Sequence, residues 1–395
     1  MLEYFDRRSL ANVDDRKEAI TVQNLLDMTS GIEWTMPDSM FEMERSPDWV
    51  KFVLDRPMSS APGNVFNYSN GNAHLVSAIL TKLTGMSALE YAKAKLFGPL
   101  GIIDLYWEHD PQGISNGGKG LYLQARDMAK IGYLFLHDGA WEGKQLLPSH
   151  RTDEVTRATV DPRAPGEPAL RYSDFFWVLP DKHVCAASGY HGQVIMVFPE
   201  LDVVAVTTGR DNYPLSKLAD YIFISVKSDT ALASDAPTAN LLANKVIDVS
   251  TEKRTEAGSP PEMAAIISGK VYRFPPNAIK VKSLSLILTD PLPRYDVEMY
   301  VDDATKSGPR FSGPIGLDGL YRKGEPTCPE ALAIRQVNAV KGTWQDDHIF
   351  VVDRLVLGEG QPAEEWRLSF DGKKLRVRAK LGDGSEISTD GETGG

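Results

Sequence analysis

The stretch FNYSNGNAHLVSAILTKLTG, residues 66–85, joins a polar turn to an amphipathic segment. Apolar side chains recur at helical spacing from Leu75 to Leu83, and Gly85 supplies a stop signal, so the sequence predicts a helix that ends there. Asparagine and serine are preferred helix N-caps, and turn-forming residues precede them. The segment Tyr68-Ser69-Asn70 therefore has two interpretations, a turn that caps a helix or one wall of an active site.

The residues on either side of this stretch, from 1 to 230, mix helical and strand periodicities. The segment LQARDMAKIGYLFLHDG, residues 123–139, repeats the helical spacing of apolar side chains. The segment QVIMVFPELDVVAVTTG, residues 193–209, predicts a buried hairpin of two strands around a Pro-Glu-Leu-Asp turn. We therefore expect residues 1–230 to form one domain that contains both helices and strands.

The pattern changes after residue 230. Residues 231–262 are poor in aromatic side chains and carry a Gly-Ser-Pro-Pro run near their end, which predicts a linker with room for one short helix. In EEWRLSFDGKKLRVRAK, residues 364–380, apolar and polar side chains alternate, and Asp371-Gly372 is a tight-hairpin signal. Residues 263–395 are therefore predicted to form a separate antiparallel β-sheet or barrel domain.

The composition excludes several classes of protein. The chain of 395 residues has 42% hydrophobic and 25% charged residues, as globular proteins do, and its net charge of −11 argues against non-specific nucleic-acid binding. Cys185 and Cys328 lie outside any CxxC or Cys/His cluster, which argues against structural zinc or a disulfide scaffold. No apolar run approaches the ~18 residues of a membrane span. The charged start MLEYFDRRSLANVDD shows no signal peptide.

Four stretches occur in a telling order: ITVQNLLDMTSGI (residues 20–32), the Tyr-Ser-Asn loop, GKGLYLQARDMAKIGYLFLHDGAWEGKQLLP (residues 118–148) and ASGYHGQVIMVFPELDVVAVTTGR (residues 187–210). Together they resemble the serine β-lactamase and penicillin-binding-protein-like hydrolases, which include class C β-lactamases, esterases, D-aminopeptidases and amide hydrolases. The resemblance covers roughly residues 15–225. It implies an α+β fold with an antiparallel sheet flanked by helices, and neither cofactor nor metal, because serine acyl transfer needs none.

In this family an S-x-x-K helix, a Y-x-N loop and a K-T-G-like strand meet at one acyl-transfer site. The serine attacks the substrate while a lysine and a tyrosine share the task of removing its proton. The resemblance implies that Tyr68 is the general base of acylation or the proton donor to the leaving group. Asn70 would hydrogen-bond the lysine and the substrate amide or ester.

The K-T-G position aligns with Tyr190, His191 and Gly192. Gly192 would let substrate lie along a strand edge, and the backbone N–H of Gln193 would be an oxyanion-hole donor. Tyr190 replaces a lysine that would pair with a substrate carboxylate, which favours an esterase or amidase over a β-lactamase or DD-peptidase. His191 either hydrogen-bonds substrate or satisfies a neighbour at the strand edge, and His74 is interpreted as structural.

No serine before Tyr68 is followed by a lysine three residues later. Ser250 to Lys253 is the only S-x-x-K in the sequence, and its place in the polar linker indicates a chance match. The resemblance thus implies an N-terminally truncated domain with no nucleophile in the chain. Removing the serine helix would open a cavity, so we expect unusual exposure at Leu25, Leu26 or the helix over residues 75–83.

Three functional interpretations follow. The first is a serine hydrolase that acts on a small-molecule ester or amide by an acyl-enzyme route, seen without its nucleophile segment. The alternative is a catalytically inactive, truncated relative that binds a ligand or partner through the residual cleft. In a third interpretation the C-terminal β domain is the functional part. The oligomeric state stays open, and family members are often exported to the periplasm or secreted.

Overall fold

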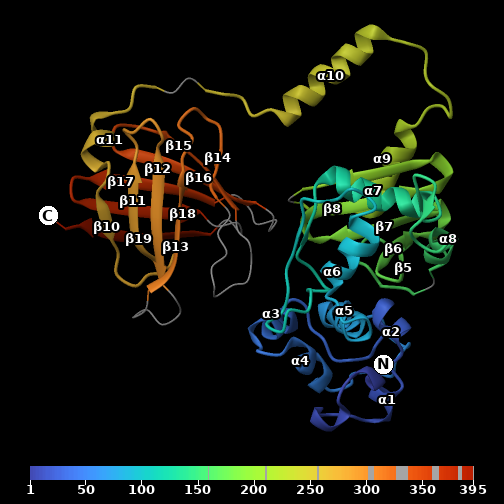
Figure 1. Cartoon of the computed structure of the whole chain (residues 1–395). Helices are drawn as coiled ribbons and strands as arrows, with labels where there is room; N and C mark the ends of the chain where they lie inside the picture. Colours follow the sequence, from blue (N-terminus) through green and yellow to red (C-terminus); the bar gives the residue numbers. More distant parts are fainter. Residues whose placement is uncertain are drawn as a thin grey trace. The chain divides into compact units, whose positions relative to one another are not determined.

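The structure, a computed structural model, describes residues 1–158, 160–209, 211–255, 258–300, 307–325, 337–357, 364–380 and 385–394. The chain divides into two compact units, Met1–Ala231 and Leu232–Gly395. The first unit mixes helices and strands, and the second is mainly β-sheet (Figure 1). Within the described ranges, no helix is long and apolar enough to cross a membrane.

Helix α5, Asn70–Thr84, belongs to the helical part of the first unit. The Ser69 side chain caps it by accepting the N–H of Asn72 at 3.2 Å, and Gly85 ends it with a left-handed φ of 71°. The predicted cap and stop are therefore confirmed. The neighbouring helices are α1 (Asp15–Glu18), α2 (Val22–Leu26), α3 (Asp38–Arg45), α4 (Trp49–Asp55) and α6 (Ala88–Ala92).

A closed apolar core lies between α5 and the helices α2 and α4. Leu25 and Leu75 are 0% exposed, and Leu2 packs into the same cluster with 3% exposed. The expectation of unusual exposure is therefore wrong for Leu25 and Leu75, because the first residues of the chain cover this cluster. Leu83, in the last turn of α5, is exposed.

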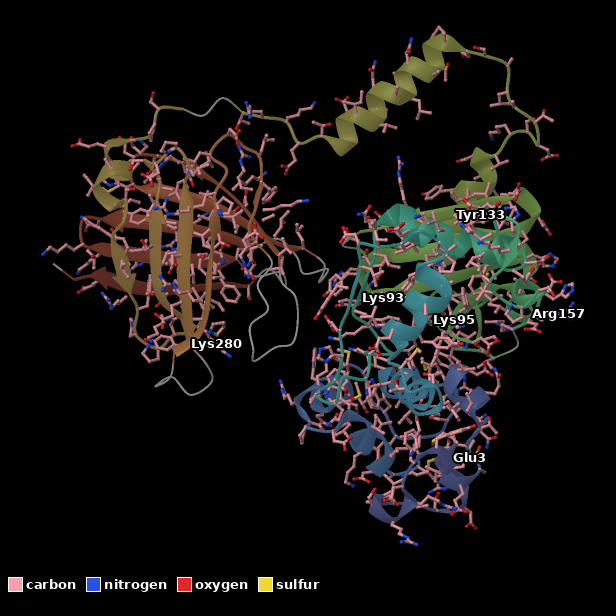
Figure 2. All side chains as sticks on the ribbon, viewed as in Figure 1. Glu3, Lys93, Lys95, Tyr133, Arg157 and Lys280 are labelled. Atoms are coloured by element: carbon pink, nitrogen blue, oxygen red, sulfur yellow. The ribbon has the colours of Figure 1, made fainter. Side chains whose placement is uncertain are left out.

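Five antiparallel strands form the sheet of the first unit, in the order β5-β6-β7-β8-β9. Helix α7 (Ala125–Leu136) packs on one face, where a Cβ at Gly132 would lie only 2.5 Å from Val204, and Tyr133 lies on its surface (Figure 2). Helix α9 (Leu215–Ser225) packs on the other face, where Ala219 is buried with Met196. The strands are β5 (Arg171–Ser173), β6 (Phe176–Leu179), β7 (Val184–Gly189), β8 (Gln193–Phe198) and β9 (Val203–Thr207).

The helix predicted within residues 123–139 and the hairpin predicted within residues 193–209 are thus both confirmed. The hairpin reverses at Pro199–Leu201, between β8 and β9. The smaller elements of this unit are β1 (Tyr106–Trp107) paired with β2 (Leu121–Tyr122), β3 (Ala140–Trp141) paired with β4 (Lys144–Gln145), and α8 (Arg151–Thr156).

The second unit is a ten-stranded antiparallel sheet that curls into a nearly closed barrel, in the order β13-β12-β11-β10-β19-β18-β17-β16-β15-β14. Gly316, just after β13, bridges to Lys341 of β15 and so brings the two ends of the sheet together. The tight hairpin predicted from Asp371-Gly372 joins β17 to β18, and its two turn residues are Gly372 and Lys373, one position later than the signal. The strands are β10 (Val271–Arg273), β11 (Val281–Ile287), β12 (Arg294–Tyr300), β13 (Ser307–Pro314), β14 (Arg322–Lys323), β15 (Val337–Trp344), β16 (Ile349–Leu357), β17 (Glu364–Asp371), β18 (Lys374–Lys380) and β19 (Glu386–Thr393).

The segment interpreted as a linker contains α10 (Ala236–Ser250), a helix of 15 residues and so longer than expected. The short helix α11 (Glu262–Ile267) follows and packs on the barrel core through Ala264 and Ile267. Lys253, the lysine of the only S-x-x-K, is 82% exposed and lies 4.0 Å from Asp248. An exposed lysine paired with a surface carboxylate fits the interpretation of this match as chance.

Candidate active site

Tyr68 lies on the extended segment that leads into α5. Its ring stacks on Trp177 of β6, with centroids 6.2 Å apart and an interplanar angle of 20°. Trp177 in turn meets Tyr172 of β5 edge to face at 5.1 Å, and Tyr172 meets Phe66 at 5.0 Å. Four aromatic rings from two distant segments therefore fix the position of Tyr68 against the sheet.

Burial alone raises the pKa of Tyr68 above its ordinary value. Burial also raises the pKa of Tyr172, and the nearby acidic groups of Tyr68 and Asp27 raise it further. Both phenols are therefore protonated at neutral pH. Tyr68 is thus suited to donate a proton, and it would need a nearby cation to act as a base.

Asn70 is the first residue of α5 and is only 6% exposed. Its Nδ2 donates to the backbone carbonyl of Gly118 at 3.1 Å. Its Oδ1 is buried and has no hydrogen-bond partner among the residues that the structure describes. A buried acceptor that has no hydrogen-bond donor costs about 1–3 kcal/mol, so this oxygen is available to accept a hydrogen bond from an ammonium or a substrate N–H.

The segment Tyr190–Gly192 forms a tight turn between β7 and β8 rather than part of a strand, and the backbone of His191 within it is not helical. His191 and Gly192 have φ values of 57° and 84°, and a Cβ at Gly192 would lie 2.4 Å from the carbonyl of Asp211. The glycine is thus explained by the turn and by this close backbone approach. Tyr190 is 74% exposed, with its ring centroid 3.8 Å from that of His191.

Gln193 opens β8, opposite Gly189 of β7. Its side-chain amide donates to the carbonyls of Gly209 at 2.7 Å and His191 at 3.2 Å, which fastens the turn to the end of β9. The hydroxyl of Thr207 donates to the carbonyl of Gly192 at 2.9 Å. The three residues aligned with K-T-G, together with Gln193, therefore form one hairpin end that is hydrogen-bonded to the end of β9.

The end of β7 has an open edge that the sequence did not reveal. The pairing of β6 with β7 stops at Trp177–Ala186, whereas the pairing of β7 with β8 continues to Gly189–Gln193. The segment Ala187–Gly189 thus extends past the ladder on the β6 side. Because Trp177 stacks on Tyr68, this edge begins beside the ring of the candidate proton donor. This open edge could be found only from the pairing registers of β6 with β7 and of β7 with β8.

Trp177 is held in place by an unusual turn. The β5–β6 hairpin reverses at Asp174 and Phe175, whose φ values are 51° and 67°, although neither is glycine. The N–H of Phe175 donates to the carbonyl of Leu26 at 3.0 Å, and the N–H of Asp174 donates to Asp27 at 3.1 Å. Helix α2 therefore stabilises a strained turn whose effect is to place Trp177 under Tyr68.

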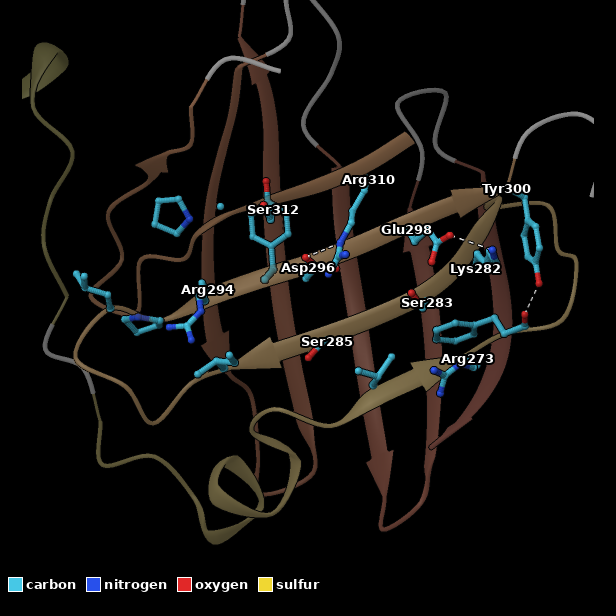
Figure 3. Close-up of a pocket in the computed structure, with 18 residues that line it drawn as sticks. Arg273, Lys282, Ser283, Ser285, Arg294, Asp296, Glu298, Tyr300, Arg310 and Ser312 are labelled. Carbon is cyan, nitrogen blue, oxygen red and sulfur yellow. Dashed lines mark hydrogen bonds and ion pairs between the residues drawn. The ribbon is translucent and has the colours of Figure 1, made fainter. Parts of the chain in front are cut away.

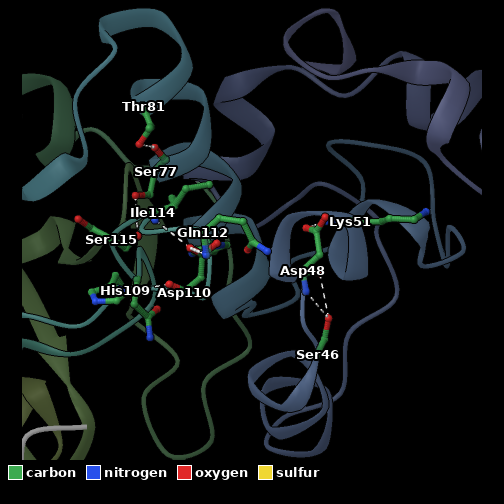
Figure 4. A network of polar contacts seen from close by, with 12 residues as sticks. Ser46, Asp48, Lys51, Ser77, Thr81, His109, Asp110, Gln112, Ile114 and Ser115 are labelled. Atoms are coloured by element: carbon green, nitrogen blue, oxygen red, sulfur yellow. Dashed lines mark hydrogen bonds and ion pairs between the residues drawn. The ribbon is translucent and has the colours of Figure 1, made fainter. Parts of the chain in front are cut away.

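His74 of α5 forms a fully buried pair with Asp110, with 3.2 Å between Nε2 and Oδ2. Oδ1 of Asp110 accepts the backbone N–H groups of Gln112 and Ile114 (Figure 4). The hydroxyl of Ser77 donates to the carbonyl of Ser115 in the same loop at 2.7 Å. These contacts fasten the loop over residues 109–115 to α5 and support a structural role for His74.

In the described part of the chain, no group of three or more histidine, cysteine, aspartate or glutamate side chains is arranged to hold a metal ion. The site therefore consists of a buried amide, a phenol, an open strand edge and a rigid hairpin end. Groups of these kinds are chemically able to hydrogen-bond a polar molecule and to donate a proton to it.

A protein-family model and several solved structures match this chain. A protein-family model described as Beta-lactamase matches residues 8–224. A solved structure from Bacillus anthracis, named as a 6-aminohexanoate-dimer hydrolase, is 22% identical with a TM-score of 0.44, over 58% of this chain and 62% of that one. The chain therefore spans about six tenths of the length of that protein.

Two further solved structures are similar. A D-stereospecific amidohydrolase from Streptomyces sp. is 19% identical with a TM-score of 0.35, over 50% of this chain and 65% of that one. An octameric penicillin-binding protein homologue from Pyrococcus abyssi is 14% identical with a TM-score of 0.40, over 96% of this chain and 80% of that one.

Proposed function

The chain belongs to the β-lactamase family, and from that premise we propose that residues 1–230 are part of a serine hydrolase that cleaves an ester or an amide through an acyl-enzyme intermediate. The observation that carries the proposal is the buried Oδ1 of Asn70, which lacks a partner among the described residues two positions after Tyr68. A structural cap does not need this oxygen, since Ser69 already caps α5. A catalytic asparagine does need it, to hold an ammonium or a substrate N–H.

In the proposed reaction a serine hydroxyl attacks the carbonyl carbon of the substrate and loses its proton to a base. The tetrahedral intermediate then collapses, and the leaving oxygen or nitrogen takes a proton from the phenol of Tyr68. Water hydrolyses the acyl-enzyme in the second step and releases a carboxylic acid. The backbone N–H of Gln193, or an N–H of the open edge Ala187–Gly189, would stabilise the oxyanion.

No S-x-x-K occurs among the residues that precede Tyr68, so the serine and the lysine of this mechanism are not identified there. We propose that they lie in a segment outside these residues. The absence of the motif also favours the second candidate, an inactive relative that binds a ligand in the residual cleft without turning it over. The two candidates differ in turnover and not in binding.

A neutral substrate fits the hairpin end best. Tyr190 stands where a lysine would pair with a substrate carboxylate, and its side chain is largely exposed. The phenol offers a hydrogen bond without a positive charge. This supports an ester or amide over a β-lactam or a peptidoglycan stem.

The test uses the gene read upstream of Met1 in the same frame, expressed with and without that upstream segment. We expect the longer product to hydrolyse p-nitrophenyl butyrate, and Tyr68→Phe to lower its kcat by about 10²–10⁴, as loss of general acid–base catalysis does. Tyr213→Phe, a change at an exposed surface tyrosine, is the matched control and should leave kcat unchanged. Equal turnover of wild type and Tyr68→Phe would exclude this role for Tyr68.

A labelling experiment separates the candidates. A fluorescent penicillin should not label the chain over residues 1–395, and covalent labelling there would contradict the absence of a nucleophile. If the longer product binds p-nitrophenyl butyrate saturably but does not hydrolyse it, the protein is a ligand-binding relative without catalytic activity.

A further inference from the structure

The barrel of the second unit contains an apolar cavity of about 70 Å³ that the hydrolase chemistry does not use. Its walls come from the inward-facing residues of six strands, among them Leu284, Val297, Phe311, Val352 and Trp366. Another part of the barrel interior is filled by aromatic rings, where Phe370 contacts Tyr272 and Trp344. The core is therefore packed in one part and hollow in another.

The opposite face of the same strands is polar. Figure 3 shows the outer side of β10–β13, where Ser285, Asp296 and Arg310 project from neighbouring strands. Side chains alternate between the two faces of a strand, so an apolar inner row next to a polar outer row is the pattern of a lined cavity. The alternation of inward apolar and outward polar side chains along β11, β12 and β13 therefore forms this wall of the cavity.

Arg354 supplies one charged group to this cavity. Its Nε donates to Oδ1 of Asn338 at 2.9 Å and its Nη1 to Oε2 of Glu364 at 2.8 Å. Among described residues its Nη2 has no acceptor. The side chains of Arg354 and Glu364 are 24% and 28% exposed, so the ion pair is partly in contact with solvent.

Tyr295 is the second polar group of the lining. Burial raises the pKa of its hydroxyl, and the charge of Arg354, which lines the same cavity, acts in the opposite direction. Within the described ranges this hydroxyl makes no hydrogen bond. An apolar hollow therefore carries two donors with spare capacity, Arg354 and Tyr295.

We propose that the barrel cavity binds a small neutral amphiphile, a short alkyl chain with one carbonyl group that accepts hydrogen bonds from Arg354 and Tyr295. Glu364 already neutralises Arg354, so a carboxylate would bring an uncompensated negative charge to a partly buried place. A cation would meet the positive charge of the guanidinium and be repelled by it. A neutral carbonyl satisfies both donors at no electrostatic cost.

The volume of the cavity limits the length of the alkyl chain of the ligand. One water needs about 10–15 Å³ of such space, so the cavity holds about five water-sized groups. That matches an alkyl chain of about five carbons with its carbonyl at Arg354. Hexanamide has these features and dissolves in water, which makes it the probe.

The test measures binding of hexanamide to the full chain by saturation-transfer NMR titration. We expect saturable binding with a Kd of ~1 mM or tighter. Hexanoate should bind at least about tenfold more weakly because of its charge, and hexylammonium should not bind. Acetamide should bind about a hundredfold more weakly, because it lacks four buried methylene groups.

Two variants locate the site, each with a matched control. Val352→Phe fills the cavity and should abolish binding. Val351→Phe should not, because Val351 is the preceding residue of β16 and lies on the opposite face of the strand. Arg354→Gln should weaken binding about tenfold or more. Arg310→Gln removes an arginine that is also paired with a carboxylate, Asp296, but on the outer face, and should leave the Kd unchanged. Far-UV circular dichroism checks that each variant folds.

Binding at the barrel is independent of the proposed hydrolase function, because the readout needs no turnover and Val352→Phe leaves the first unit intact. The absence of saturable hexanamide binding would show that the cavity holds water alone and would overturn the proposal. Binding that persists equally in Val352→Phe would place the ligand elsewhere and overturn it as well. Tighter binding of hexanoate than of hexanamide would contradict the neutral headgroup.

Discussion

The buried pair of His74 and Asp110 tests how helix α5 is fixed. Asp110 is fully buried, its Oδ1 accepts the N–H groups of Gln112 and Ile114 at 2.9 and 2.8 Å, and its Oδ2 lies 3.2 Å from His74. Alanine would leave two backbone donors and one imidazole unpaired. Each buried orphan costs about 1–3 kcal/mol. We therefore expect Asp110→Ala to lower the free energy of unfolding of the first unit by about 3–5 kcal/mol.

Asp110→Asn separates the two kinds of contact. Both backbone N–H groups bond to Oδ1, and asparagine retains an oxygen there. Only the contact with His74 changes, from a carboxylate oxygen to an amide nitrogen. The loss should therefore be about 1.5–3 kcal/mol, the value of one hydrogen bond to a charged group. The difference between the two variants measures the two backbone bonds.

The assay is urea unfolding of the full chain, with hydrogen exchange over residues 70–84 as the readout of the first unit. A local readout is needed because a chain of two units does not unfold as one two-state system. Asp153→Ala is the control, since Asp153 is 61% exposed and lies 4.0 Å from His150, and it should change stability by less than about 0.5 kcal/mol. Equal losses for Asp110→Ala and Asp153→Ala, or for Asp110→Ala and Asp110→Asn, would refute the reasoning.

Two further predictions follow from buried titratable groups. Burial raises the pKa of Tyr172 above the ordinary 10.0, so the folded state keeps this proton to a higher pH than the unfolded state does. The stability of the fold is therefore retained below pH 10.0 and falls as the pH rises above it. Tyr172→Phe should make this fall less steep in urea midpoints measured between about pH 9 and 11, and an unchanged slope would contradict the assignment. Burial raises the pKa of the Cys185 thiol to about 12. In a Cys328→Ser variant, the native protein should therefore not react with Ellman's reagent at about pH 8, whereas the urea-unfolded protein should react fully. Rapid labelling of the native protein would show that the thiol is accessible and would contradict this prediction.

Local patterns account for the elements that the sequence predicted well. Helix α5, its Ser69 cap and its Gly85 stop depend on neighbouring residues alone, and so does the hairpin over residues 193–209. The strands of the second unit follow from alternation. The near closure of its sheet does not, because the bridge from Gly316 to Lys341 joins segments whose pairing no local pattern encodes.

The candidate site divides in the same way. The segment with Tyr68 and Asn70 was predicted from its residues and from the family resemblance. Trp177, which stacks on Tyr68, was missed because the contact depends on the register of β6 and on a turn held by α2. The segment Tyr190–Gly192 was expected along a strand and lies in a turn, since two successive positive φ values reverse the chain there.

In the proposed mechanism, Tyr68 and Asn70 share one requirement, a positive charge. Burial keeps the pKa of Tyr68 raised, so its phenol is a poor base as long as no cation stands beside it. Oδ1 of Asn70 is a buried acceptor that lacks a donor among the described residues. A neutral donor would satisfy Asn70 and leave Tyr68 unchanged. A single ammonium group would both donate to Oδ1 and lower the pKa of the phenol, which is the physical reason for placing a lysine at this loop.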